Sequence, residues 1–164
     1  MKLKFTKQLQ KLFTGMLFCS MASVFFSCQK TAPVPYATPS YGSDTATRSM
    51  QGEVGSNFTP TFFTPTITYS GGNITFTGKS QYYTITLTFP ATSGPNTYFF
   101  STDPGYSASV YDGTNTYKAN ASDGGGSLTI SSIVNGKYSG TFDIDGQDPS
   151  FNFLEINRGS FLNL

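Results

Sequence analysis

Tyr83-Thr84-Ile85-Thr86-Leu87-Thr88-Phe89 is the stretch that best predicts the fold. Apolar or aromatic side chains alternate with threonines over its whole length, and Pro90 follows it. A period of two is typical of a β-strand that is buried on one face only. We therefore expect a strand whose apolar residues face a core and whose threonines face solvent.

Similar patterns recur along the rest of the chain. One hairpin is predicted around Gly71-Gly72, and another around Asn135-Gly136, a pair preferred in type I′ turns. Roughly eight to ten short strands at regular spacing predict an all-β domain, either an antiparallel β-sandwich or a flattened barrel, mostly in meander order. Shorter strands are expected at residues 97–100, 107–111, 114–118, 151–156 and 158–164.

The N-terminal segment precedes this pattern and differs from it. Lys2, Lys4, Lys7 and Lys11 come before an uncharged and largely apolar run, residues 12–26. A basic region followed by a short apolar one is the plan of a secretory signal peptide. The run is too short to cross the hydrocarbon core of a bilayer, about 30 Å thick, as a helix.

Cys28 ends this segment. Val24-Phe25-Phe26-Ser27-Cys28 resembles a bacterial lipobox, in which the cysteine becomes the acylated first residue of the mature protein, although Phe25 stands where leucine is usual. The resemblance implies a signal peptide at residues 1–27, lipidation of Cys28 and a membrane as partner through the lipid anchor. Ordinary signal cleavage near Ser27, which leaves Cys28 as a free thiol, is the alternative.

Residues 28–56 are rich in Pro, Ser, Thr and Gly and show no apolar period. Such a composition predicts a flexible tether, because it cannot bury enough apolar surface to offset the entropy of ordering. The all-β domain is accordingly predicted at residues 57–164.

Composition excludes several classes of function. The chain after residue 27 carries six basic and nine acidic residues, so its net charge is 6 − 9 = −3. Without a basic cluster it has no electrostatic basis for binding nucleic acid. The chain contains no His, and Cys28 is the only cysteine after residue 27, so Ser-His-Asp and Cys-His catalysis lack their base. We expect neither an enzyme nor a cofactor.

Three acidic residues, Asp143, Asp145 and Asp148, lie within six positions. Carboxylates at this density are a weak candidate for a hard-cation loop. The spacing lacks the alternating oxygen ligands of an EF-hand, and the favoured interpretation is a polar turn after a strand.

Exposed tyrosines suggest a sharper hypothesis, binding of a glycan or small ligand by ring stacking. The alternative is that the aromatic residues only fill a core without tryptophan and pair across strands. A structural or adhesive envelope subunit with protein partners is the other class considered. The candidate residues lie at predicted strand ends or opposite the core face: Tyr82, Tyr98, Tyr106, Tyr111 and Tyr117.

Four further segments carry a resemblance at the level of a family. Ser107–Gly113, Gly126–Ile130, Tyr138–Phe142 and Arg158–Phe161 share a strand–turn pattern of Thr, Ser and Gly. With the lipobox, they resemble small Bacteroidota lipoproteins whose all-β domain has no assigned function. The resemblance implies a protein anchored by lipid in the outer membrane. Gln29-Lys30 lacks the acidic residues of some surface-export signals, which favours the periplasmic face.

Overall fold

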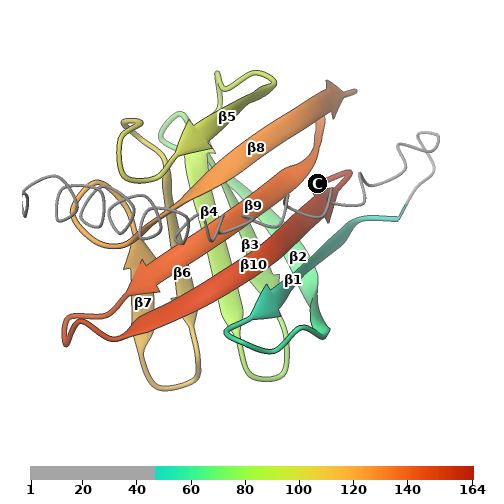
Figure 1. Ribbon diagram of the computed structural model, residues 1–164. Coiled ribbons are helices and arrows are strands. Elements are labelled where there is room, and N and C mark those ends of the chain that lie inside the picture. The colour runs from blue at the N-terminus through green and yellow to red at the C-terminus, as the bar shows by residue number, and fades with distance from the viewer. Residues whose placement is uncertain (1–46) are drawn as a thin grey trace, which may run out of the picture. The chain divides into compact units, whose positions relative to one another are not determined.

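The computed structural model describes residues 47–164, and this part of the chain consists of ten β-strands joined by turns and loops (Figure 1). No helix in it is long and apolar enough to cross a lipid bilayer. In chain order the strands are β1 (Ser49–Val54), β2 (Pro60–Ser70), β3 (Asn73–Lys79), β4 (Thr84–Pro90), β5 (Asn96–Phe99), β6 (Ser107–Tyr111), β7 (Thr116–Ala119), β8 (Gly125–Val134), β9 (Lys137–Gln147) and β10 (Phe153–Leu162).

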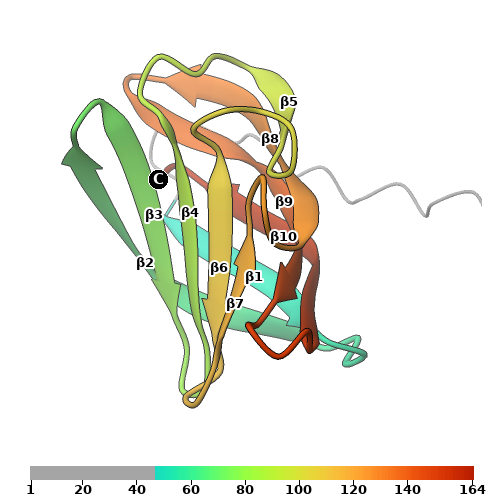
Figure 2. The ribbon, with the colours of Figure 1, turned by 90° about the vertical axis from the view of Figure 1, so that its left-hand side faces the viewer.

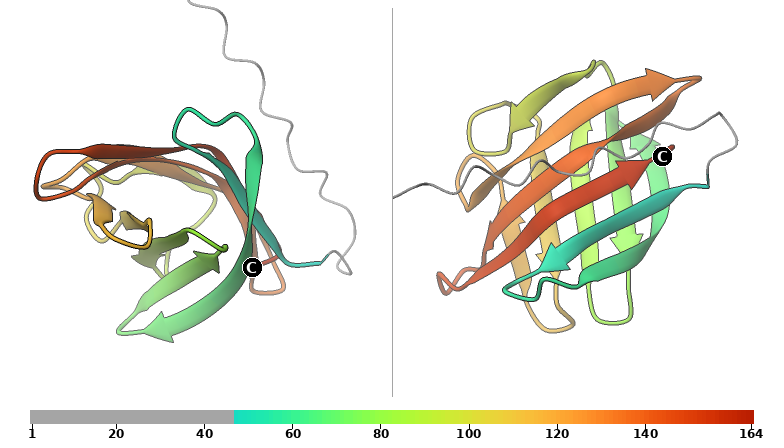
Figure 3. Two further views of the ribbon diagram at one scale, coloured as in Figure 1. Left: turned by 90° about the horizontal axis from the view of Figure 1, so that it is seen from below. Right: turned by 45° about the vertical axis from the view of Figure 1, so that its right-hand side comes forward.

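Eight of the strands form a closed antiparallel barrel in the order β10-β1-β2-β3-β4-β6-β7-β9, which closes because β9 also pairs with β10. Figure 3 shows these strands surrounding a common interior, with β8 and β5 continuing outward from β9. The prediction of an all-β fold is thus confirmed. Of the two predicted architectures, the β-sandwich is wrong and the barrel is correct. Pairing of β1 with β10 and of β7 with β9 joins what would have been two separate sheets.

Closure between β7 and β9 depends on one residue pair, Lys118 with Gln147. The neighbouring junction of β9 and β10 runs in contrast from Phe153 to Phe161. We call the short junction the β7–β9 seam. Most neighbours in the barrel are consecutive in sequence, in agreement with a meander, and the order departs from it where β5 and β8 are left out.

Phenylalanine fills the interior. On β4, Ile85, Leu87 and Phe89 are fully buried, as their alternation with threonine predicts. The Phe76 ring contacts those of Phe89 and Phe161 edge to face, with centroid distances of 5.0 and 5.4 Å. Edge-to-face contacts of this kind add to the free energy gained from apolar burial.

The hairpin between β8 and β9 also follows its sequence signal. Asn135 and Gly136 both have positive φ, 52° and 75°, as a type I′ turn requires. This turn therefore uses the two residue types that adopt the left-handed region at least cost.

The predicted boundary between tether and domain is wrong. Residues 49–54, assigned to the tether, form β1, which pairs with both β2 and β10. Met50 is buried, and the buried Glu53 carboxylate binds the Arg158 guanidinium at 3.2 Å. The domain thus begins before residue 57. The predicted signal peptide, Cys28 and residues 28–46 of the tether lie outside the described residues.

Candidate functional site

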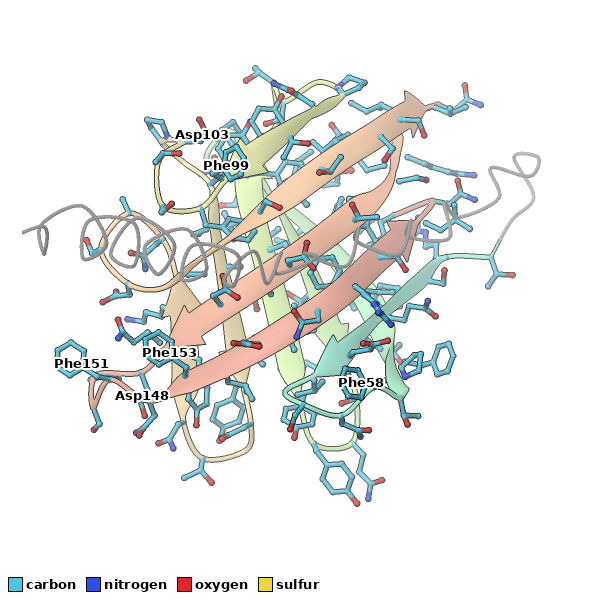
Figure 4. The ribbon with its side chains drawn as sticks, in the orientation of Figure 1. Phe58, Phe99, Asp103, Asp148, Phe151 and Phe153 are labelled. Atoms are coloured by element: carbon cyan, nitrogen blue, oxygen red, sulfur yellow. The ribbon has the colours of Figure 1, made fainter. Side chains whose placement is uncertain are left out.

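Because neighbouring strands run in opposite directions, four connections lie at one end of the barrel (Figure 1, lower edge and lower left). They are those between β1 and β2, β3 and β4, β6 and β7, and β9 and β10. Large exposed aromatic side chains gather on them. We call Tyr82, Tyr111, Phe151 and Phe153 the aromatic rim. Phe58, on the β1–β2 connection, is exposed at this end as well (Figure 4).

The β9–β10 loop carries the two phenylalanines of the rim. Phe151 is 76% exposed and Phe153 is 63% exposed, and Figure 4 shows the Phe151 side chain pointing away from the strands. Phe151 has a φ of 63°, which lies in the left-handed region. For a residue with a bulky side chain this backbone conformation costs about 1–2 kcal/mol. The ring of Phe151 makes no compensating contribution to the core.

Asp148 holds this loop in place. One carboxylate oxygen accepts the backbone N–H groups of Ser150 and Asn152, each at 2.9 Å, and the other accepts the Asn152 side-chain amide at 2.9 Å. The backbone N–H of Phe151 donates to the Asp148 carbonyl at 3.0 Å. The hydrogen bonds from Asn152 and Ser150 lower the pKa of Asp148 below its ordinary value. The loop is therefore a rigid support for Phe151.

A second aspartate organises the neighbouring β6–β7 loop. Asp112 accepts the backbone N–H groups of Asn115 at 2.7 Å and Thr114 at 2.8 Å, and these bonds lower its pKa. The Tyr117 hydroxyl donates to the same carboxylate at 3.2 Å. The two loops are neighbours, because β7 begins and β9 ends at this end of the barrel and the two strands pair. Asp112 raises the pKa of Asp148 electrostatically, against the stronger lowering by the hydrogen bond from Asn152.

The structure separates the five predicted tyrosines into two groups. Tyr82 and Tyr111 are exposed on the rim, and Tyr117 is buried below it. Tyr98 and Tyr106 belong to the other end of the barrel, where their rings stack on each other with centroids 4.2 Å apart. The five candidates are therefore not on one surface, and the exposure expected for Tyr117 is wrong, because its ring is buried and its hydroxyl bonds to Asp112.

Tyr98 and Tyr106 have structural partners of their own. The Tyr98 hydroxyl donates to the Gly94 carbonyl at 3.0 Å, and the hydroxyls of Tyr106 and Ser93 are 2.5 Å apart. Burial raises the pKa of Tyr106. These two rings pack the β4–β5 connection against β6.

The three acidic residues proposed as a weak metal site have separate roles. Asp143 accepts the backbone N–H of Arg158 at 3.1 Å, Asp145 is exposed on β9, and Asp148 binds its own loop. Nowhere between residues 47 and 164 do three His, Cys, Asp or Glu side chains come together as a metal site. Asp145 to Gln147 belong to β9, so the polar turn expected at residues 145–150 begins only at Asp148.

A family model described as a domain of unknown function, DUF6252, matches residues 46–164. The chain belongs to the DUF6252 family. The match begins next to β1, so the DUF6252 domain includes this strand, which sequence reasoning had placed in the tether. Among the curated proteins and the solved structures that were searched, none matches the chain.

Within this DUF6252 domain, sequence reasoning missed Phe151 and Phe153 as functional candidates. A signal for them was present, since Asp148-Pro149-Ser150 is a turn sequence and both phenylalanines follow it closely. The rim offers aromatic faces on rigid loops, an arrangement suited to binding a ligand that presents a flat apolar face.

Proposed function

We propose that this DUF6252 domain is a non-catalytic glycan-binding module, held at the cell envelope by a lipid on Cys28. The observation that supports binding is the display of Phe151 and Phe153 on a loop held by Asp148. Backbone strain at Phe151 reduces stability, its exposed ring gains little from burial, and strain of this kind concentrates at functional sites.

A pyranose ring is the ligand that suits this surface. One face of many sugars presents C–H groups, which pack on an aromatic ring, while their hydroxyls remain hydrated. The hydrogen bonds of Asp148 order the loop before the ligand arrives, so that little conformational entropy is lost on binding.

The acidic residues beside the rim support binding over catalysis. A glycosidase needs a general acid with a raised pKa. Asp112 and Asp148 instead have lowered pKa values, because both accept hydrogen bonds from their own loops. Both carboxylates are ionised acceptors of the hydrogen bonds that order their own loops.

Binding to immobilised polysaccharides tests the proposal. We expect the double variant Phe151→Ala/Phe153→Ala to lose at least about tenfold in affinity with its circular dichroism spectrum unchanged. The matched control is Phe99→Ala, because Phe99 is also exposed and also adjoins an aspartate-held turn, at the other end of the barrel (Figure 4). Equal losses in both variants, or no binding of any polysaccharide by the wild type, would contradict the proposal.

Mass spectrometry of the mature protein tests the anchor. Acylation at Cys28 and absence of residues 1–27 are expected, and Cys28→Ser should release the protein from membranes. Protease treatment of intact cells then tests the favoured periplasmic orientation, in which the DUF6252 domain is protected. Digestion in intact cells would place the domain on the cell surface.

A protein-binding envelope subunit is the second candidate, and the edge of β2 favours it. Thr64–Ser70 pair with β3 on one side and with no described strand on the other, whereas Pro60–Phe63 pair with β1. An open edge of this kind accepts an added strand from a partner. Ser70 and Asn73 form the hydrogen-bonded pair that closes the Gly71-Gly72 turn, and such pairs alternate along the ladder, so the backbone N–H of Tyr69 faces the open edge. Replacement of Tyr69 by proline should abolish binding of an added strand and leave polysaccharide binding unchanged.

A further inference from the structure

The outer face of the barrel next to the rim carries hydroxyl groups in register. Thr86 on β4 lies between Thr77 on β3 and Ser109 on β6, and Thr88 lies opposite Ser107. Directly paired residues point to the same side of a sheet. The threonines that marked β4 as a strand therefore belong to a continuous polar surface, which Figure 2 views from the side of β3, β4, β6 and β7.

A groove of about 190 Å³ lies in this surface, between β4, β6 and β7. At about 30 Å³ for each water molecule, it has room for about six waters, or for one ligand of the size of a sugar ring. It is lined mainly by side-chain hydroxyls and one ammonium group, from Thr86, Thr88, Ser107, Ser109, Thr116 and Lys118.

Lys118 gives the groove its charge. In the part of the chain that the structure describes, Lys118 forms no salt bridge, and no carboxylate lines the groove. Asp145 lies diagonally across the β7–β9 seam, two residues from Gln147, on the same outward face. The groove thus combines a positive charge with hydroxyls that donate and accept hydrogen bonds.

The groove and the aromatic rim are joined through the register of the sheet. Ser109 pairs with Lys118, Lys118 pairs with Gln147 across the seam, and Gln147 pairs with Phe153. Lys118 and Phe153 are therefore two strands apart on one face, about 10 Å at the usual strand spacing. A short oligosaccharide spans this distance.

We propose that the ligand is a polysaccharide bearing carboxylate groups, such as a polymer of uronic acids. One sugar ring stacks on Phe153, and the carboxylate of a neighbouring unit binds the Lys118 ammonium with its hydroxyls in the groove. This inference depends on the proposed glycan-binding function and adds to it the charge of the ligand and the path that the ligand takes.

The test compares polygalacturonate with its carboxyl-reduced, neutral form by isothermal titration calorimetry. We expect Lys118→Gln to weaken binding of polygalacturonate about tenfold and to leave the neutral polymer unaffected. Asp145→Asn, which removes a like charge, should strengthen binding of polygalacturonate by a few-fold. Lys79→Gln is the matched control, because it removes one positive charge from the same outer face outside the groove.

Equal effects of Lys118→Gln and Lys79→Gln, or wild-type binding of both polymers with one affinity, would overturn the inference and leave the rim proposal intact. Equal binding of a sulfated polymer would overturn the assignment to carboxylate. Binding of polygalacturonate that depends on Lys118 but is insensitive to Phe151→Ala/Phe153→Ala would instead overturn the rim proposal. Failure of both polymers to bind overturns both.

Discussion

Phe142 on β9 is 1% exposed, whereas Phe153 on the neighbouring strand β10 is 63% exposed. The first ring packs in the barrel beside that of Phe161, and the second faces solvent beside the Asp148 loop. Burial of the Phe142 ring stabilises the folded state. The exposed Phe153 ring gains little stabilisation of this kind. The comparison separates a ring that stabilises the fold by burial from a ring that does not.

The largest effect on stability is expected in the interior. Phe142→Ala removes a buried ring and leaves a cavity, so we expect a loss of about 3–5 kcal/mol in the free energy of unfolding. Urea denaturation followed by circular dichroism measures it. A loss below about 1.5 kcal/mol would show that the interior relaxes around the cavity and would weaken the contrast with the rim.

Asp148→Ala tests the support of the rim. The variant loses the acceptor for three hydrogen bonds, so its melting temperature should fall by several degrees and its glycan affinity should fall although both phenylalanines are present. Asp145→Asn is the control for stability, since Asp145 is exposed on β9. Unchanged binding in Asp148→Ala would show that the loop needs no preorganisation.

The same aspartate predicts a dependence on pH. Because the pKa of Asp148 is lower in the folded state than its ordinary value of 3.8, its stabilising contribution is complete above that value and is lost as the pH falls through the folded-state pKa. The difference in melting temperature between wild type and Asp148→Ala should therefore narrow below about pH 4. A constant difference from neutral to acidic pH would contradict this role.

Phe151→Asn separates stability from binding. Asparagine tolerates the left-handed conformation better than phenylalanine, so the free energy of unfolding should be unchanged or should rise by up to about 1 kcal/mol. Glycan binding should weaken in the same variant. A clear loss of stability would mean that the Phe151 ring contributes to the fold, contrary to its exposure.

The smallest effect on stability is expected for Phe153→Ala, within about 0.5 kcal/mol of the wild type. Affinity for polysaccharide should nevertheless fall, because the variant lacks the ring beside Gln147. A thermal melt and a binding titration on one preparation check both expectations. Retained affinity would show that Phe153 does not contribute to binding, which would then depend on Phe151, Tyr82 and Tyr111.

Local sequence patterns were sufficient where local geometry decides the structure. The alternation in β4 and the Asn135-Gly136 turn are examples, since their periods and φ preferences follow from the residues themselves. In β1 the inward positions are Met50, Gly52 and Val54, so glycine interrupts the apolar alternation. A Cβ at Gly52 would lie 2.7 Å from the Ile156 side chain, and this long-range contact is invisible in the local sequence.

The candidate site was less predictable for a similar reason. Tyr82 and Tyr111 are exposed as expected, but the placement of Tyr98 depends on how β5 pairs with β8, about thirty residues further along the chain. The choice between sandwich and barrel depended on the pairing of β1 with β10 and of Lys118 with Gln147, which no local pattern encodes.

The pair of Lys118 with Gln147 also determines where the barrel opens first. Amide hydrogen exchange and mechanical extension should both begin by parting β7 from β9, because a junction of one residue pair has the fewest hydrogen bonds to break. A polymer lying across Lys118 and Phe153 crosses this junction and fastens its two sides together. Occupancy by ligand would then be measurable as slower opening of the barrel, even in an assay that does not detect the ligand itself.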